Sequence, residues 1–169
     1  MIMLPMLFVV LARDAYNIPT GRVPAIAAGV LLAEIQQTSD IACRIYDYDR
    51  VDKVTGEKRA LHNDLALDVI DFNVEKNDKT NYDLHENECN ELIHTPYLKS
   101  NVFNVTKILS RNYTLLDSFM IFICTKGNLD IVVSKESYNL TKGETILLPA
   151  SIKSVHIIPN IDSEILEVS

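Results

Sequence analysis

The chain has little cysteine, and its cysteines are not spaced for cross-linking. It holds only Cys43, Cys89 and Cys124 in 169 residues. An odd number of distant cysteines argues against a disulfide framework, and also against a zinc knuckle, whose ligands stand a few residues apart. We therefore predict three reduced thiols.

Positive charge is scarce as well. Sixteen Lys and Arg residues stand against 23 Asp and Glu residues, which gives a formal net charge of -7 at pH 7. Phosphate backbones and anionic lipid surfaces repel such a chain, so the balance argues against nucleic acid or a membrane as a partner. It fits a soluble cytoplasmic protein, and the cytoplasm is the location we expect.

No apolar run is long enough to cross a membrane. The most apolar stretch, Met1–Ala12, is shorter than the roughly 20 residues that a spanning helix needs, and it lacks the basic start of a signal peptide. We interpret residues 1–14 as a leader that could form a buried strand. With 47% hydrophobic residues in its 169 residues, the chain as a whole can bury one core.

The segment Ala33–Arg50 carries charged, amide and aromatic groups in two stretches that we interpret as β-strands. A half-buried strand alternates apolar and polar residues, so side chains two positions apart share a face. In the first stretch that spacing places Glu34 and Gln36 together, and in the second it places Arg44 beside two tyrosines. The segment therefore reads as one wall of a site.

Simpler interpretations of these residues stay open. Arg44 could be a surface arginine on a solvated strand, and Glu34 could pair with an arginine such as Arg22 instead of lining a pocket.

Three motifs in order carry a resemblance to a known family. They are Ile-Pro-Thr-Gly-Arg-Val-Pro-Ala-Ile at 18–26, Gly-Val-Leu-Leu-Ala-Glu-Ile-Gln-Gln-Thr-Ser-Asp at 29–40, and Arg-Ile-Tyr-Asp-Tyr-Asp-Arg at 44–50. Their sequence and spacing resemble type I mannose-6-phosphate isomerase in its short bacterial form. The resemblance covers residues 15–169 and implies that the amino-terminal catalytic portion of the family's first barrel is missing.

The resemblance implies a cupin barrel that holds zinc and interconverts mannose 6-phosphate and fructose 6-phosphate. It implies that Arg44 is the catalytic arginine and that Glu34 and Gln36 line the substrate pocket. Aldose–ketose isomerisation passes through an enediol-like intermediate, so negative charge grows on oxygen and fixed positive groups stabilise it. Zinc acts there as a Lewis acid, while an always-protonated guanidinium supplies directed donors.

One position departs from the family pattern. The family places a zinc-ligating histidine directly after Gly-Arg-Val, where this chain has Pro24, and its other zinc ligands lie upstream of the matching region. The four histidines of the chain form no HxH or HxxxH pair. We therefore expect that zinc, the cofactor of the family, is not bound by this chain alone.

The second half of the chain predicts a mainly β fold. Apolar residues spaced along Arg59–Asp71 predict one short amphipathic helix, and the polar stretch after it predicts a linker. Short apolar runs separated by turn residues then predict a cupin-like jelly roll, a β-sandwich or barrel, with Lys126-Gly-Asn as a hairpin turn. The strands are expected at Glu91–His94, Phe103–Leu109, Arg111–Leu115, Ser118–Thr125, Asn128–Val133, Glu136–Leu140, Thr145–Leu148, Lys153–Ile158 and Glu164–Val168.

Four regions follow from this pattern. They are a leader at 1–14, the closing strands of a truncated first cupin barrel at 15–50, the helix and polar linker at 51–90, and a carboxy-terminal cupin-like domain at 91–169. Closing strands without the rest of their barrel would expose strand edges, so self-association through those edges is a further expectation.

Two functions remain open from the sequence. The first is an isomerase whose zinc ligands come from a separate polypeptide and whose substrate is a sugar phosphate. The second is a non-catalytic cupin-like remnant that acts as a binding or interaction domain. The family resemblance favours the first, and the incomplete ligand set favours the second, because a Lewis acid contributes strongly to this chemistry.

Overall fold

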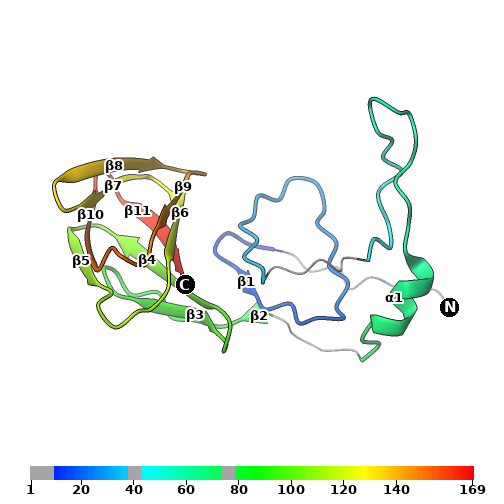
Figure 1. Cartoon of the computed structure of the whole chain (residues 1–169), viewed down its shortest axis with the longest axis horizontal. Coiled ribbons are helices and arrows are strands. Elements are labelled where there is room, and N and C mark those ends of the chain that lie inside the picture. Colours follow the sequence, from blue (N-terminus) through cyan, green and yellow to red (C-terminus); the bar gives the residue numbers. More distant parts are fainter. Residues whose placement is uncertain (1–9, 38–42, 74–78) are drawn as a thin grey trace. The chain divides into compact units, whose positions relative to one another are not determined.

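The computed structural model describes residues 10–37, 43–73 and 79–169 (Figure 1). The first nine residues of the expected leader, residues 38–42 between the two expected β stretches and part of the expected linker therefore lie outside the described residues. The chain divides into two compact units. Unit 1 comprises Met1–Ala12 and Tyr16–Asp78, and unit 2 comprises Arg13–Ala15 and Lys79–Ser169.

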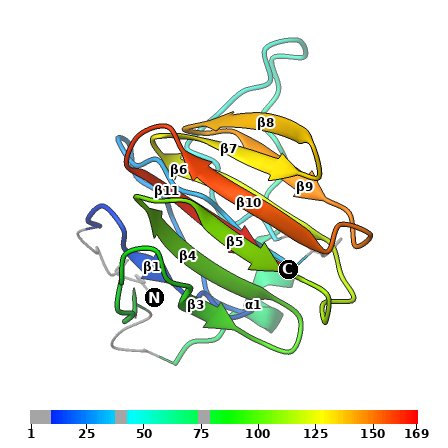
Figure 2. The same cartoon turned by 90° about the vertical axis from the view of Figure 1, so that its left-hand side faces the viewer.

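Unit 2 is built from two antiparallel sheets. Figure 2 shows the strands of the four-stranded sheet, β5, β10, β7 and β8, side by side. The four-stranded sheet has the order β5-β10-β7-β8, and the five-stranded sheet has the order β3-β4-β11-β6-β9. The strands are β3 (Asn90–His94), β4 (Lys99–Val105), β5 (Leu109–Asn112), β6 (Met120–Lys126), β7 (Asn128–Val133), β8 (Glu136–Thr141), β9 (Thr145–Leu148), β10 (Ser154–Pro159) and β11 (Ser163–Val168).

Alternating side chains from both sheets form the core of unit 2. On β6 the inward residues are Met120, Phe122 and Cys124, and on β7 they are Leu129 and Ile131. All five are at most 6% exposed. This is the period of two that a sandwich requires, because each strand can turn only every second side chain inward.

The turn between β6 and β7 depends on a glycine. Gly127 has a φ of +84°, and a Cβ atom there would lie 2.3 Å from Oγ of Ser163. Ser163 in turn accepts a hydrogen bond from the backbone N–H of Asn128 at 3.0 Å. Both the left-handed backbone and the close approach exclude a side chain. The predicted turn is confirmed, but the predicted hairpin is wrong, because β6 pairs with β11 and β9 in one sheet and β7 pairs with β10 and β8 in the other.

Each predicted run in unit 2 contains or overlaps a strand, and Asn128–Val133 and Thr145–Leu148 have the predicted bounds. The run Phe103–Leu109 is displaced, because β4 spans Lys99–Val105. The reason is Asn87, whose side-chain oxygen accepts hydrogen bonds from the backbone N–H groups of Thr106 and Lys107 at 2.9 and 3.0 Å. These amides are thereby held in a turn instead of a strand.

The single helix of the described residues is α1 (Asn63–Val69), in unit 1. It is shorter than the predicted Arg59–Asp71, because the backbone N–H of His62 donates to the carbonyl of Arg44 at 2.7 Å. Residues 58–62 therefore run beside the segment around Arg44 and join the helix only at Asn63. The mainly β fold with one short helix is confirmed.

The interpretation of Ala33–Arg50 as two β stretches is wrong for its described residues, since residues 33–37 and 43–50 carry no strand. Tyr48 and Asp49 have φ values of 52° and 54°. This left-handed backbone ends an extended run, and the N–H of Arg50 closes a turn onto the carbonyl of Asp47 at 3.0 Å.

Between residues 15 and 50 the strand that the structure describes is β1 (Ala15–Tyr16), which pairs with β2 (Lys79–Thr80). The region boundaries at 14, 50 and 90 stay predictions. The three cysteines are free thiols. Within the described parts of the chain, no helix has the length and apolar character needed to cross a membrane.

Candidate functional site

Arg44 is half-buried and is held by the chain that leads into α1. Its guanidinium donates from Nη1 to the carbonyl oxygen of Ala60 at 3.2 Å. Its backbone N–H donates to Nδ1 of His62, also at 3.2 Å, and its carbonyl oxygen accepts from the N–H of His62. The backbone of Arg44 is thus fixed on both sides by one residue, while the guanidinium keeps further N–H groups for other acceptors.

Two ion pairs join the same two segments of chain, residues 47–49 and residues 58–59. The guanidinium of Arg59 binds both carboxylate oxygens of Asp47, with Nε at 2.8 Å from Oδ2. Nζ of Lys58 lies 2.6 Å from Oδ1 of Asp49. Hydrogen bonds from Arg59 hold the pKa of Asp47 below its ordinary value, and the charge of Arg44 acts in the same direction. Asp47 is therefore an anion at neutral pH that orients its neighbours.

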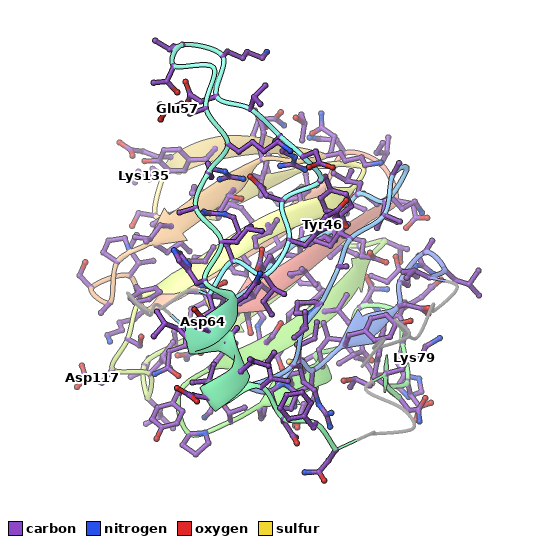
Figure 3. The ribbon with its side chains drawn as sticks, turned by 90° about the vertical axis from the view of Figure 1, so that its right-hand side faces the viewer. Tyr46, Glu57, Asp64, Lys79, Asp117 and Lys135 are labelled. Atoms are coloured by element: carbon purple, nitrogen blue, oxygen red, sulfur yellow. The ribbon has the colours of Figure 1, made fainter. Side chains whose placement is uncertain are left out.

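The two tyrosines expected beside Arg44 contact each other. The ring centroids of Tyr46 and Tyr48 are 5.1 Å apart, and the guanidinium that stacks on Tyr48 is that of Arg50, at 5.7 Å. Figure 3 shows Tyr46 on the chain leading to the loop that carries Glu57. The pairing of Tyr48 with Arg50 follows from the turn at Tyr48 and Asp49, which redirects the side chains that a strand would have aligned.

The other predicted site residues stand at the surface. Glu34, Gln36 and Pro24 are all exposed. In the part of the chain that the structure describes, no hydrogen bond or ion pair connects Glu34 or Gln36 to Arg44. Arg22, the alternative partner of Glu34, lies with Nη2 3.8 Å from Oδ2 of Asp71 and donates from Nη1 to the carbonyl of Asn73.

The described residues do not fit a zinc ion. Three or more zinc-ligating side chains converge nowhere among residues 10–37, 43–73 and 79–169. Pro24 has no donor atom to offer in place of the histidine. The ring nitrogens of three histidines hydrogen-bond within the protein, with His62 to Arg44, His94 to Asn101 and His156 to Ser110. No step proposed below is routed through a metal.

A polar cluster in unit 2 was not predicted from the sequence. Glu167 on β11 is 2% exposed, and its carboxylate accepts from Nε and Nη2 of Arg111 at 3.1 and 2.9 Å. It also accepts from Nδ2 of Asn101 at 3.1 Å and from the hydroxyl of Tyr113. A glutamate inside the apolar run Ile-Leu-Glu-Val was the available signal, since a charged residue is rarely buried without partners.

The strand register explains how this cluster forms. Glu167 lies directly opposite Asn101 on β4 and opposite Phe122 on β6. It shares its face of β11 with buried Ile165, so its carboxylate points into the space between the sheets, where β5 supplies Arg111. The carboxylate therefore connects the two sheets at one end of the sandwich.

Burial and charge perturb the groups around Glu167. Burial raises the pKa of Tyr113 far above its ordinary value, and the adjacent carboxylate adds to the effect because it opposes a second negative charge. Burial tends to lower the pKa of Arg111, but the hydrogen bonds and charge of Glu167 outweigh it and raise that pKa. Arg111 is therefore a permanent cation, and Tyr113 a permanent donor, at physiological pH.

An open depression of about 410 Å³ lies beside the cluster. Its polar walls include Lys99 and Asn101 of β4, Arg111 of β5 and Glu167 of β11. Apolar side chains complete it, namely Leu115, Leu116 and Met120.

The family model and the relatives that match this chain all belong to mannose-6-phosphate isomerases. A model of the mannose-6-phosphate isomerase cupin domain matches residues 94–162. The chain is 32% identical over 144 residues to a mannose-6-phosphate isomerase of Streptococcus mutans, which covers 85% of this chain and 45% of that protein. It is 31% identical over 139 residues to mannose-6-phosphate isomerase ManA of Bacillus subtilis, covering 80% and 43%.

A solved structure supports the fold. The crystal structure of the mannose 6-phosphate isomerase from Bacillus subtilis superposes with a TM-score of 0.61 at 19% identity, over 75% of this chain and 40% of that one. The cupin-like fold predicted from the sequence is confirmed. The chain spans less than half the length of the curated relatives that it matches.

Proposed function

The chain belongs to the mannose-6-phosphate isomerase family, and on this premise we propose that it is the Arg44-bearing part of an enzyme that interconverts mannose 6-phosphate and fructose 6-phosphate. The observation that carries the proposal is the 32% identity to the Streptococcus mutans isomerase over 85% of the chain, a span that includes far more than the cupin-domain match. Arg44 lies outside the residues of that domain match.

The proposed role of Arg44 is to stabilise negative charge on a sugar oxygen. The contacts with His62 hold the backbone of Arg44, and the carbonyl of Ala60 holds Nη1 of its guanidinium. The remaining N–H groups of the guanidinium are therefore oriented before substrate arrives. Preorganised donors of this kind stabilise an enediolate at little reorganisation cost. The ion pair of Asp47 with Arg59 supports the same segment.

Glu34 and Gln36 are proposed to bind hydroxyl groups of the sugar. Both are exposed and therefore available, one as an acceptor and the other as acceptor and donor. In this hypothesis the zinc of the family is held by ligands on a separate polypeptide, because the described residues do not provide them. The cytoplasm is the proposed location.

A second candidate function is a non-catalytic cupin-like binding or interaction domain. Pro24 favours it, because a residue without a donor atom stands where the resemblance places a zinc ligand. The depression beside Glu167 favours it too, because it provides a ligand-sized space in unit 2 without any residue of unit 1 in its lining.

Because the proposal requires zinc ligands from a separate polypeptide, the test mixes the purified full chain with the part of the Streptococcus mutans isomerase that it does not match. Isomerase turnover of mannose 6-phosphate and bound zinc are then measured in this mixture. The substitution Arg44→Lys keeps the charge but loses the planar set of donors, so we expect kcat to fall by about 100-fold. Arg50→Lys is the matched control, since Arg50 stacks on Tyr48 in the same segment, and it should leave kcat within about twofold of the parent.

Turnover that depends on Arg44 and not on Arg50 supports the isomerase. A mixture in which this chain is folded but shows no turnover with added zinc, or one whose turnover is the same after Arg44→Lys, overturns the proposal for this chain and supports the binding domain.

A further inference from the structure

The depression beside Glu167 has the size and composition of a ligand site. Its volume of about 410 Å³ is within the range of small-molecule sites, roughly 300–1,000 Å³. Such sites are lined mainly by apolar side chains with a few fixed polar groups. Here Leu116 and Met120 supply apolar surface, and Asn101 and Arg111 supply polar groups.

The guanidinium of Arg111 is held rigidly on one edge. Nε and Nη2 bind the two oxygens of Glu167, and the guanidinium carbon lies 4.9 Å from the ring centroid of Phe103 and 5.6 Å from that of Tyr113. A bidentate pair between two aromatic rings fixes the plane of an arginine. The guanidinium is thus positioned before any ligand arrives.

The Nη1 group of the same guanidinium is available, whereas Nη2 also donates to Sγ of Cys89 at 3.8 Å. No hydrogen bond from Nη1 of Arg111 reaches any residue that the structure describes. The side chain of Arg111 is 28% exposed, whereas that of Glu167 is 3% exposed, so the cation and not the carboxylate meets the solvent of the depression. Glu167, with four donors on its two oxygens, has little capacity to bind anything further.

The unused donors of the lining, and not its net charge, favour an anion. Two cationic side chains, Lys99 and Arg111, stand against the side chain of Glu167 and the terminal carboxylate of Ser169, which also lines the depression. Glu167 is saturated by its donors, whereas Nη1 of Arg111 and Nζ of Lys99 make no hydrogen bond among the described residues. An oxyanion supplies the acceptors that these donors lack.

We propose that this depression binds a small organic oxyanion, a carboxylate or a phosphate ester. Its oxygens accept hydrogen bonds from Nη1 of Arg111 and from Nζ of Lys99, while its carbon skeleton lies against Leu116 and Met120. The site is distinct from the segment around Arg44, and the proposal holds whether or not the chain is an isomerase.

The experiment is a titration of the full chain by NMR, with inorganic phosphate and acetate as separate probes at constant ionic strength maintained with chloride. We expect saturable shifts of the backbone amides at 99–101 and 111–116. A tighter fit for phosphate indicates a phosphate ester, and a tighter fit for acetate indicates a carboxylate. Lys99→Met should weaken the binding of the preferred probe about fivefold.

Lys135→Met is the matched control, because Lys135 is an exposed lysine in the turn between β7 and β8 and does not line the depression. It should leave binding unchanged. Both variants replace exposed residues, so folding is maintained. The proposal is overturned if neither probe gives saturable shifts at these amides, or if both lysine variants weaken binding equally, which would show a nonspecific effect of net charge.

Discussion

The two units differ in how far they bury their apolar side chains. Among the described residues, every buried apolar side chain lies in unit 2, with the one exception of Ala66 on α1. In unit 1, Leu31, Val54 and Leu67 are 84%, 95% and 61% exposed. Leucine and valine contribute to stability only when surface leaves water. The difference shows that apolar content alone does not make a core.

Pairing explains the contrast. In unit 2 each strand has a neighbour that accepts its backbone hydrogen bonds, so alternate side chains are directed to one side. In unit 1 the chain around Arg44 is instead joined by isolated contacts, such as the bridge between Val51 and Lys58 and the ion pair of Arg59 with Asp47. Such exposed contacts stabilise a local shape but contribute little to global stability.

The largest expected difference in stability is between two Phe→Ala variants, one in each unit. Phe122→Ala removes a side chain that is 0% exposed in unit 2 and should lower the free energy of unfolding by about 3–5 kcal/mol. Phe72→Ala removes one that is 51% exposed in unit 1 and should cost less than about 1 kcal/mol. Urea denaturation measures both. Equal losses would show that unit 1 has a core that its exposed side chains do not indicate.

The next largest loss of stability is expected when the buried ion pair of Glu167 and Arg111 is broken. Glu167→Gln leaves Arg111 without its counter-charge and should cost about 2–4 kcal/mol, and replacing both residues by Leu and Met should recover part of the loss. Lys58→Met breaks the exposed pair with Asp49 in unit 1 and should not shift the urea midpoint measurably. A double variant less stable than Glu167→Gln alone would contradict this account.

Glycine substitutions separate backbone strain from steric conflict. Gly127→Ala places a methyl group 2.3 Å from Oγ of Ser163 at positive φ, and we expect a loss of about 2–3 kcal/mol. Gly143→Ala, also at positive φ but with open space around it, should cost about 1 kcal/mol. Thermal unfolding distinguishes them, and equal shifts in Tm would mean that the turn relaxes freely around Ser163.

The smallest effect concerns alkaline pH. Because the folded protein raises the pKa of Tyr113 above its ordinary value of about 10, the folded state keeps a proton that the unfolded state releases as the pH passes that value. The stability that this group contributes is full below pH 10 and falls as the pH rises, by up to about 1.4 kcal/mol per pH unit.

Tyr113→Phe should therefore flatten the decline of unfolding free energy between about pH 9 and pH 11, although it lowers the stability at neutral pH by about 1 kcal/mol through the lost hydrogen bond to Glu167. Urea melts across that range measure it. Parallel declines for the parent and the variant would show that the folded protein does not raise the pKa of Tyr113.

The predictability of the two units follows the same contrast. The bounds of β7 and β9 could be read from the sequence, because period-two alternation between turn residues is a local signal. The displacement of β4 could not, because it depends on Asn87, a residue distant in sequence that captures two amides. The left-handed backbone at Tyr48 and Asp49 could not be predicted either, since neither residue type requires it.

The candidate sites divide in a similar way. The motif around Arg44 could be identified from the sequence, and its assignment to the family is supported by the relatives. Its local contacts with Ala60 and His62 could not, because they join segments that were predicted to be a strand and a helix. The roles of Arg44, Glu34 and Gln36 stay predictions.

By itself, the sequence determined the family, the mainly β character, the turn at Gly127 and the scarcity of zinc ligands near Pro24, because each depends on residue identity or on spacing along the chain. Only the tertiary structure decided that Glu167 is buried, that Arg111 is held on one edge and available on the other, and that a depression forms beside them. These features require β4, β5 and β11 to meet, and the register between strands distant in sequence is set by packing of the whole sandwich.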